Sequence, residues 1–228
     1  MSGHLAGRSG PLLVAVAGSV AAGKSTLAAA LAAALAAHPD GPVVEVVSTD
    51  GFLYPNAALA ARGLLARKGF PETYDHGLIA DVLGRVARGA RDIAVPRYSH
   101  RTYDRAGPPQ VLHQPDVVIV EGIHALAPPV ADLCTVLVYL DAAPDDLRSW
   151  FVTRFTGLVA AAHDDPGSFF AGWTAMSDDD VRHLAAAVWE QVNLVNLVEH
   201  ILPTRWQADI VLRKGADHAV THVATRTS

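Results

Sequence analysis

Short apolar runs alternate along this chain with longer segments of helical composition. The apolar runs predict buried strands at residues 12–17, 43–47, 116–120, 135–140 and 208–212. Between and after them, the residue patterns predict helices at 27–35, 78–86, 145–162 and 178–200. Strands and helices that alternate in this order predict an α/β fold, with a mostly parallel sheet and helices on both of its faces.

Polar segments interrupt this alternation. Residues 52–76 show little periodicity apart from a short helix predicted at 57–65, and a connection of that length is usually functional or mobile. Residues 92–113 predict an irregular hairpin over the active site. We expect these segments, together with residues 150–175, to cover the site and exclude water from it.

Composition limits the class of protein and its partners. The chain has 228 residues, half of them hydrophobic, which suits a single domain over residues 11–228 after a Gly- and Ser-rich tail at 1–10 that we expect to be disordered. The formal net charge of −5 and the absence of a Lys/Arg cluster argue against nucleic-acid binding, so a small-molecule partner is expected. The single cysteine, Cys134, excludes a disulfide framework and fits a cytoplasmic protein.

The N-terminus superficially resembles a secretory signal, because Arg8 precedes an apolar run and small residues. Cleavage near Ala21 or Ala22 would cut a glycine-rich loop in half, so we reject this interpretation. No other apolar stretch in the sequence is long enough to span a bilayer, and no membrane partner is expected.

That glycine-rich loop satisfies the phosphate-binding pattern G-x-x-x-x-G-K-[ST]. It is formed by Gly18, Ser19, Val20, Ala21, Ala22, Gly23, Lys24, Ser25 and Thr26. A predicted strand precedes it and a helix follows, which places a helix N-terminus under the phosphates. Lys24 would reach the outer phosphates, and the Ser25 hydroxyl would bind Mg²⁺. The alternative, a glycine turn that binds nothing, is disfavoured by the flanking elements.

Two acidic residues follow predicted strands. Asp50 comes just after the second strand, where open α/β sheets form their ligand crevice. It is either a turn-forming residue beside Gly51 or a catalytic residue, and its position favours catalysis. Glu121 ends the third strand, and we expect it near Mg²⁺, directly or through water. The alternative for Glu121 is an acid that caps a surface turn.

The last predicted helix contains polar residues with two competing explanations. Ser177 and the three aspartates after it are the pattern of an N-cap, not a metal site. Asn193 and Asn196 share one helix face with Trp189 and His200. Buried amides need partners, so this pair either ties down a loop or faces a polar ligand, and the sequence leaves both open.

No N-K-x-D guanine signature is present, so a small-molecule kinase fits better than a GTPase. Further motifs make the chain resemble bacterial type I pantothenate kinases, within the phosphoribulokinase and uridine kinase group. The matching segments are residues 18–26, 48–56, 68–72, 98–100, 103–104, 121–122, 154–155, 193–197 and 201–205, with Lys214 and His218 after them. They keep the family order over nearly the whole chain.

The resemblance implies an ATP- and Mg²⁺-dependent transfer of phosphate to a primary hydroxyl, with pantothenate as the preferred acceptor. It implies that Asp50 is the base, that Lys24 and Arg154 stabilise the transferring phosphoryl group, and that a homodimer forms. The implied acceptor contacts are Tyr98, His100, Asn193, Phe155, Phe170 and Trp173, and Lys214 and His218 are implied near adenine.

The chain departs from the family pattern at several positions. Phe151 and Trp173 replace tyrosines, His124 replaces an asparagine, and Ala29 stands where a basic residue meets the inhibitor coenzyme A. The segments before the first strand and after Glu121 are shorter than usual. A uridine kinase-like enzyme or a kinase of a natural-product alcohol is therefore the alternative, and a nucleotide-binding module without catalysis is a further one.

Overall fold

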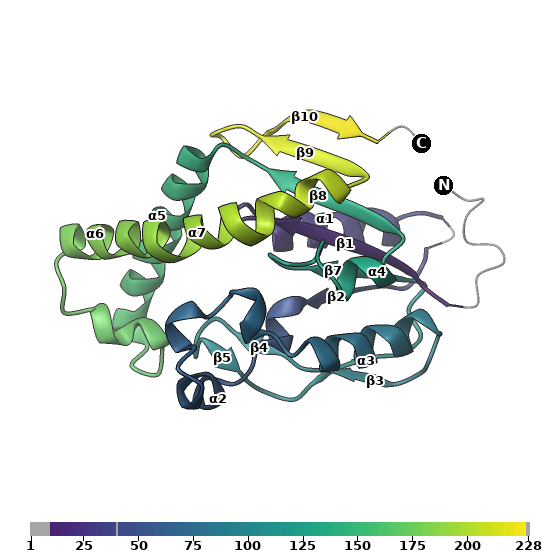
Figure 1. The fold of residues 1–228 in the computed structure, drawn as a ribbon, viewed down its shortest axis with the longest axis horizontal. Coiled ribbons are helices and arrows are strands. Elements are labelled where there is room, and N and C mark those ends of the chain that lie inside the picture. Colours follow the sequence, from purple (N-terminus) through teal and green to yellow (C-terminus); the bar gives the residue numbers. More distant parts are fainter. Residues whose placement is uncertain (1–9, 40, 227–228) are drawn as a thin grey trace.

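The computed structural model describes residues 10–39 and 41–226 and contains a central sheet (Figure 1). The strand order is β10-β9-β8-β1-β7-β2. Its bounds are Leu12–Gly18 for β1, Val44–Ser48 for β2, Val117–Glu121 for β7, Val136–Asp141 for β8, Ile210–Lys214 for β9 and Val220–Thr225 for β10. All neighbours are parallel except β9 and β10, which confirms the predicted α/β fold.

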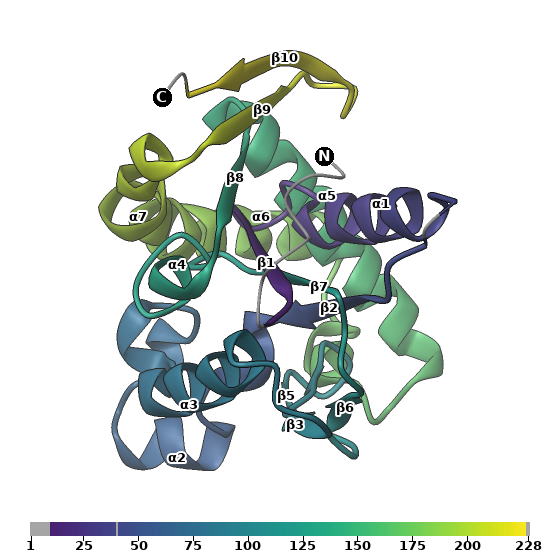
Figure 2. The same ribbon diagram turned by 90° about the vertical axis from the view of Figure 1, so that its right-hand side faces the viewer.

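Alternate side chains of β1 pack into two separate hydrophobic cores, because successive residues of a strand point to opposite faces of the sheet. Val14 and Val16 pack with Ala28 of helix α1 (Lys24–Ala36) on one face. Leu13, Ala15 and Ala17 join the larger cluster on the other face. Helices α3 (His76–Ala87) and α4 (Val130–Leu133) contribute to that cluster, so helices lie on both sides of the sheet (Figure 2).

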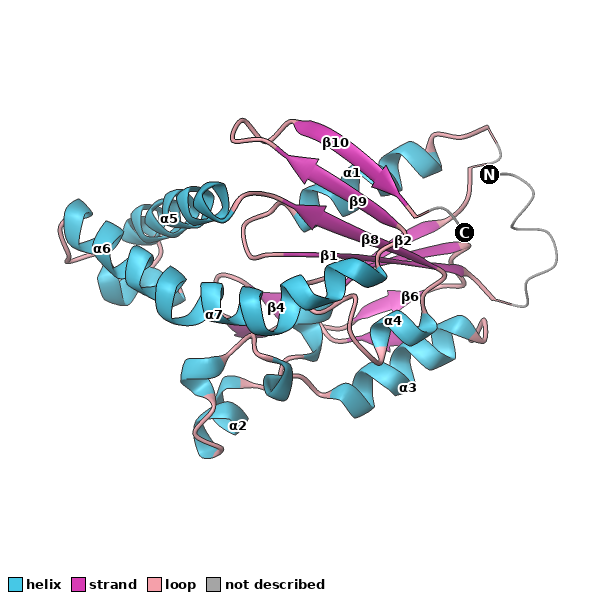
Figure 3. Cartoon of the chain, turned by 45° about the horizontal axis from the view of Figure 1, so that its top comes forward, coloured by secondary structure: helices cyan, strands magenta, loops and turns pink. Residues whose placement is uncertain are grey.

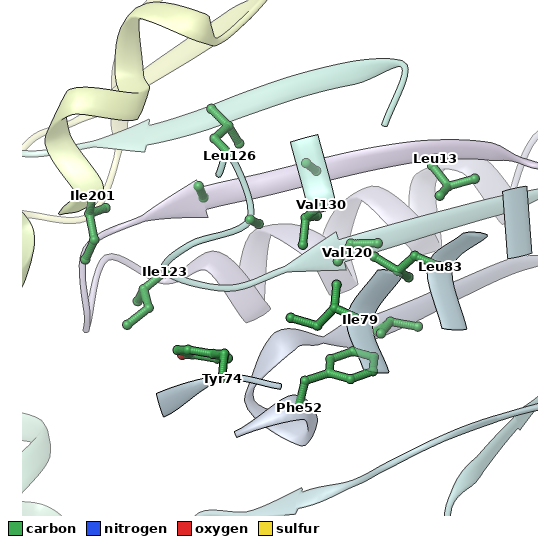
Figure 4. Close-up of a cluster of buried hydrophobic side chains, with 14 of the residues drawn as sticks. Leu13, Phe52, Tyr74, Ile79, Leu83, Val120, Ile123, Leu126, Val130 and Ile201 are labelled. Atoms are coloured by element: carbon green, nitrogen blue, oxygen red, sulfur yellow. The ribbon is translucent and has the colours of Figure 1, made fainter. Parts of the chain in front are cut away.

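The larger core reaches into the segment that follows β2. Phe52 and Tyr74 belong to the same cluster as Ile79 and Leu83 of α3 and Val120 of β7, and Figure 4 shows Phe52 below Ile79. Each of these side chains is almost fully buried. Burying a large apolar side chain contributes about 1.5–3 kcal/mol, so the 52–76 segment is anchored in the core both at its start and near its end.

The two segments without clear periodicity fold into short pieces. Residues 52–76 contain helix α2 (Asn56–Ala61), shorter than the predicted 57–65 helix, and 3₁₀ turns at Leu65–Arg67 and Pro71–Thr73; a further 3₁₀ turn at Thr49–Phe52 leads into the segment. In the 92–113 segment, β3 (Ile93–Val95) pairs with β6 (Gln110–Leu112), and β4 (Tyr98–Ser99) pairs with β5 (Asp104–Arg105). These nested antiparallel pairs confirm the irregular hairpin.

Helices α5 (Pro144–Ala161) and α6 (Asp178–Val188) project beyond the sheet (Figure 3). Short 3₁₀ turns at Ala162–Asp164 and Phe169–Trp173 connect them. Phe155, Phe170 and Val181 form a third, smaller core between these elements. Ser177 accepts a hydrogen bond from the Asp180 amide at 3.2 Å, which confirms the predicted N-cap of α6.

The C-terminal third differs from the sequence prediction in two ways. The helix after α6 contains π-helical turns at Trp189–Asn193 and Leu197–Ile201 around α7 (Leu194–Asn196), and it continues as a 3₁₀ helix over Leu202–Gln207. The predicted helix ends at residue 200, so the 3₁₀ helix that follows it was not predicted. Strand β10 was not predicted because all its side chains are exposed and show no buried face.

Within residues 10–39 and 41–226, none of the helices has the length and apolar character needed to cross a membrane. The expected disordered tail lies outside the described residues except for Gly10.

Candidate active site

The carboxyl ends of three neighbouring strands bring the predicted acids together. In the register of the sheet, Glu121 at the end of β7 lies between Val16 of β1 and Ser48 of β2. Asp50 follows Ser48 by two residues, and its amide donates to the Ser48 hydroxyl at 3.4 Å. Glu121 is buried, so the interpretation of Glu121 as the cap of a surface turn is not supported.

Glycines allow this close approach. A Cβ on Gly122 would lie 1.7 Å from the Thr49 hydroxyl, and a Cβ on Gly51 would lie 2.0 Å from the carbonyl oxygen of Pro96. Real Cβ contacts are never so short, so only glycine fits at either position. Gly51 therefore has a packing role of its own, which brings the hairpin after β3 against Asp50.

The phosphate-binding loop has the backbone geometry of an anion cradle. Gly18 and Gly23 have φ values of 149° and 93°, and Ala21 has φ 63°. Such conformations favour glycine and turn successive N–H groups towards one concavity. Lys24 folds back and donates to the carbonyl oxygen of Ser19 at 2.9 Å. The buried Ser19 hydroxyl has no hydrogen-bond partner within the described residues.

Charged groups from three other parts of the chain act on Lys24 of this loop. Burial lowers the pKa of Lys24, the carboxylates of Glu121 and Asp50 raise it, and the guanidinium of Arg154 lowers it. Arg154 is an exposed residue of α5, and its charge acts on Lys24. The structure therefore brings together the four charged residues that the sequence selected for phosphoryl transfer.

The hairpin contributes aromatic and imidazole groups. Tyr98 and His100 lie edge to face at 5.3 Å between ring centroids. Desolvation lowers the pKa of His100, while the carboxylate of Asp50 opposes that shift and the charge of Arg154 adds to it. Desolvation and the neighbouring Tyr103 and Asp50 raise the pKa of Tyr98, so its hydroxyl stays protonated and can donate a hydrogen bond.

Lys68 is a site residue to which the sequence analysis gave no role. Its buried ammonium donates to Asn56 Oδ1 at 2.6 Å and to the Tyr103 carbonyl oxygen, and it lies over the rings of Tyr98 and Tyr103. Burial lowers the pKa of Lys68 to about 8, although the carboxylates of Asp104 and Asp50 raise it. The sequence feature that could have identified Lys68 as a site residue is its position in a polar segment without helical periodicity.

The two amides on the last helix have different environments. Asn196 Nδ2 donates to the carbonyl oxygen of Gly69 at 2.8 Å, and His124 Nε2 contacts the same oxygen at 2.8 Å. Asn196 therefore ties down the loop beside Lys68. Asn193 Nδ2 is buried without a hydrogen-bond partner in the described part of the chain, so it remains available to a polar ligand.

The predicted apolar acceptor contacts mostly pack against one another. Phe155 and Phe170 are buried in the small core at 5.7 Å between ring centroids, and Trp173 packs on both. Tyr103 meets the edge of Phe170 at 6.4 Å. This cluster forms a wall behind the hairpin, and Phe170 is the member in contact with Tyr103.

Lys214 and His218 lie beside the phosphate loop, next to Ala22 and Gly23. Lys214 Nζ donates to the carbonyl oxygen of Ala22 at 2.8 Å, and it lies 3.3 Å from His218 Nδ1. Trp150 of α5, which the sequence analysis missed, stacks on His218 at 4.1 Å. Its indole N–H donates to the carbonyl oxygen of Ala216 at 3.2 Å. These residues form a flat aromatic and cationic surface beside the loop.

Possible metal ligands are few. Among residues 10–39 and 41–226, no three His, Cys, Asp or Glu side chains gather in a metal-binding arrangement. Ser25 in the first turn of α1 and Glu121 at the end of β7 offer a hydroxyl and a carboxylate oxygen. Oxygen donors of this kind suit Mg²⁺, which usually keeps several waters and phosphate oxygens as ligands.

Comparison with known proteins agrees with this geometry. The phosphoribulokinase / uridine kinase family matches residues 13–154. A pantothenate kinase of Sorangium cellulosum is 48% identical over 95% of this chain and 73% of its own length. The pantothenate kinase of Brucella ovis is 42% identical over 95% and 71%.

Solved structures show the same fold. A kinase assigned to a fructose transport system in Silicibacter sp. TM1040 superimposes with a TM-score of 0.74 at 28% identity, over 90% of this chain and 91% of its own. D-glycerate 3-kinase of Cryptococcus neoformans, at 15% identity and a TM-score of 0.66 over 95% and 90%, shares the fold. With the phosphate loop, the acids and Arg154 in one site, this chain belongs to the phosphoribulokinase / uridine kinase family and is a P-loop kinase that phosphorylates an alcohol.

Proposed function

We propose that this enzyme transfers the terminal phosphoryl group of ATP to the primary hydroxyl of pantothenate, a reaction of coenzyme A biosynthesis. The observation that carries the proposal is the placement of Asp50 and Glu121 beside the phosphate loop at one edge of the sheet, where their charges and that of Arg154 all act on Lys24. Relatives named pantothenate kinase, at 42–48% identity over most of the chain, supply the choice of acceptor.

The nucleotide would lie along the phosphate loop. The backbone N–H groups of residues 18–26 bind its phosphates, and the unpaired Ser19 hydroxyl is a further donor. The adenine ring of the nucleotide would lie towards Lys214, His218 and Trp150, since these residues form the flat surface beside the loop.

Bound Mg²⁺ neutralises phosphate charge during transfer. Ser25 and Glu121 would hold it, and their hydroxyl and carboxylate oxygens fit a hard cation that takes few protein ligands.

Phosphoryl transfer asks a protein chiefly for positioning and charge stabilisation. Asp50 orients the acceptor hydroxyl and takes its proton, while Lys24 and Arg154 stabilise the charge on the transferring group. Tyr98, His100 and Asn193 bind the polar groups of the acceptor, and Lys68 holds the hairpin and the loop at residues 68–70 around it.

The assay is release of ADP by purified protein with Mg²⁺ and ATP, across pantothenate, uridine, D-glycerate and fructose. We expect turnover with pantothenate, and Lys24→Ala serves as the inactive control. Turnover with another alcohol but none with pantothenate would refute the acceptor and leave the kinase in place. Turnover with no alcohol would instead favour a nucleotide-binding module. We further propose that the protein is cytoplasmic and forms a homodimer. Sedimentation of the purified protein tests the homodimer.

A further inference from the structure

Two segments that flank the proposed acceptor site are joined by a set of contacts centred on Arg101. One is the tip of the β4–β5 hairpin, at residues 98–105, which carries Tyr98, His100 and Tyr103. The other connects α5 to α6 at residues 162–173 and carries Phe170 and Trp173. Whatever fixes their separation also fixes the width of the space in which the acceptor would lie.

The first contact is a bidentate ion pair. Arg101 Nε and Nη2 each donate to one carboxylate oxygen of Asp165, both at 2.6 Å. Two parallel N–H···O bonds impose geometry as well as attraction. A backbone hydrogen bond helps to orient the carboxylate, because Asp165 Oδ1 also accepts from the amide of Gly167 at 3.2 Å.

The second contact fits the same geometry. A Cβ on Gly167 would lie 2.4 Å from Arg101 Nη2, so the guanidinium occupies the space that a side chain at this position would fill. The Phe169 amide donates to the carbonyl oxygen of Arg101 at 2.8 Å. The side chain and the backbone of Arg101 are therefore both held by the α5–α6 connection.

The third contact is aromatic. Tyr103 stacks on Phe169 with 4.5 Å between centroids and 20° between planes. Tyr103 has φ 52°, a conformation that costs a non-glycine residue free energy and persists where surrounding contacts impose it. Its carbonyl oxygen accepts from Lys68 Nζ and from Asn56 Nδ2, so the same residue connects the α5–α6 segment to Lys68.

We propose that Arg101, Asp165 and Gly167 form a latch that holds the hairpin against the α5–α6 connection and thereby positions His100 and Tyr103 for the acceptor. Arg101 and Asp165 are positioning residues, since they act through their neighbours and face solvent themselves. The inference rests on the proposed function for its kinetic consequence, and on the contacts alone for its structural one.

Asp165→Asn tests the latch, with Asp179→Asn as the matched control, because Asp179 pairs with Arg182 within one helix. Exposed ion pairs are individually weak, so Asp165→Asn should raise the KM for the acceptor about two- to fivefold. The KM for ATP and the kcat should change little. More ADP should be released per molecule of phosphorylated acceptor, because a loosened site admits water.

Non-additivity separates a latch from unrelated local damage. Arg101→Met and Asp165→Asn should each have this effect, and the double variant should be no worse than either alone. Gly167→Ala should raise the KM for the acceptor when Arg101 is present, because the new Cβ would clash with the guanidinium. In the Arg101→Met background, Gly167→Ala should have no further effect on this KM. Additive effects would overturn the proposal.

Hydrogen exchange gives a readout that needs no acceptor. In Asp165→Asn, amides in both 98–105 and 162–173 should exchange faster, while Asp179→Asn should leave both segments unchanged. Faster exchange confined to 162–173 would refute the latch, whatever the acceptor. If the wild-type protein does not phosphorylate pantothenate but exchange rises in both segments, the proposed function fails and the latch stands.

Discussion

Replacing Lys68 by methionine should destabilise the protein and weaken acceptor binding. The buried ammonium is hydrogen-bonded to Asn56 Oδ1 and to the carbonyl oxygen of Tyr103. The Tyr103 oxygen retains the Asn56 Nδ2 donor at 3.0 Å, so the variant leaves one half-buried acceptor, Asn56 Oδ1, without its Lys68 donor. A buried acceptor without a donor costs about 1–3 kcal/mol, and because this oxygen is only half-buried we expect a loss of about 1 kcal/mol at pH 7.

The dependence on pH gives the sharper test. The pKa of Lys68 is about 8 in the folded protein, below its ordinary value of 10.5, because burial disfavours the charge. The unfolded chain therefore binds more protons between these values, and wild-type stability should rise with pH through this window. After allowance for solvent screening, we expect a gain of about 1 kcal/mol between pH 8 and 9.5 relative to a chain without this group.

Urea unfolding of the wild type, Lys68→Met and Lys68→Arg at several pH values measures this gain. Neither variant titrates in the window, so both should lose it, and Lys68→Arg retains the charge as a control. Comparison with the variants removes the contributions of other titrating groups. A wild-type advantage that falls as pH rises, or stays constant, would refute the reasoning, because hydrogen bonding to the charged form would then outweigh desolvation.

Four further predictions concern the reaction. Lys24→Ala should abolish turnover and leave the circular dichroism spectrum unchanged, because its ammonium meets phosphate and not the core. Asp50→Asn should lower kcat about a hundredfold or more while ATP affinity, measured by calorimetry, stays near wild type. Phe151→Tyr should lower the KM for pantothenate, since a new hydroxyl can pair with a substrate group; an unchanged KM counts against that contact. Coenzyme A should inhibit weakly, because Ala29 offers no charge to its phosphates, and potent inhibition competitive with ATP would contradict this.

The sequence alone determined the nucleotide half of the site. Residues 18–26 form a strand end, a loop and a helix start that are consecutive in the chain, so their pattern shows the geometry directly. Asp50 and Glu121 were located because parallel strands present their carboxyl ends at one edge. These are local patterns combined with one rule of sheet topology.

The tertiary structure decided the partners of the acceptor half. Lys68 meets Tyr103 from 35 residues away, Arg101 meets Asp165 from 64, and Asn196 meets Gly69 from 127. Each pair involves at least one loop or turn without regular periodicity, and no local pattern specifies which segment such a loop meets. The choice between the two explanations of Asn193 and Asn196 depended on the same packing.

Strand β10 and the π-helical turns show the same limit. A fully exposed strand has no hydrophobic alternation, and β10 forms because β9 offers it a free edge of backbone N–H and C=O groups. The turns at Trp189–Asn193 and Leu197–Ile201 depart from the 3.6-residue period that sequence patterns assume. Sequence patterns thus identified elements that bury a regular face, whereas elements held by backbone pairing or by contacts between loops emerged only from the folded chain.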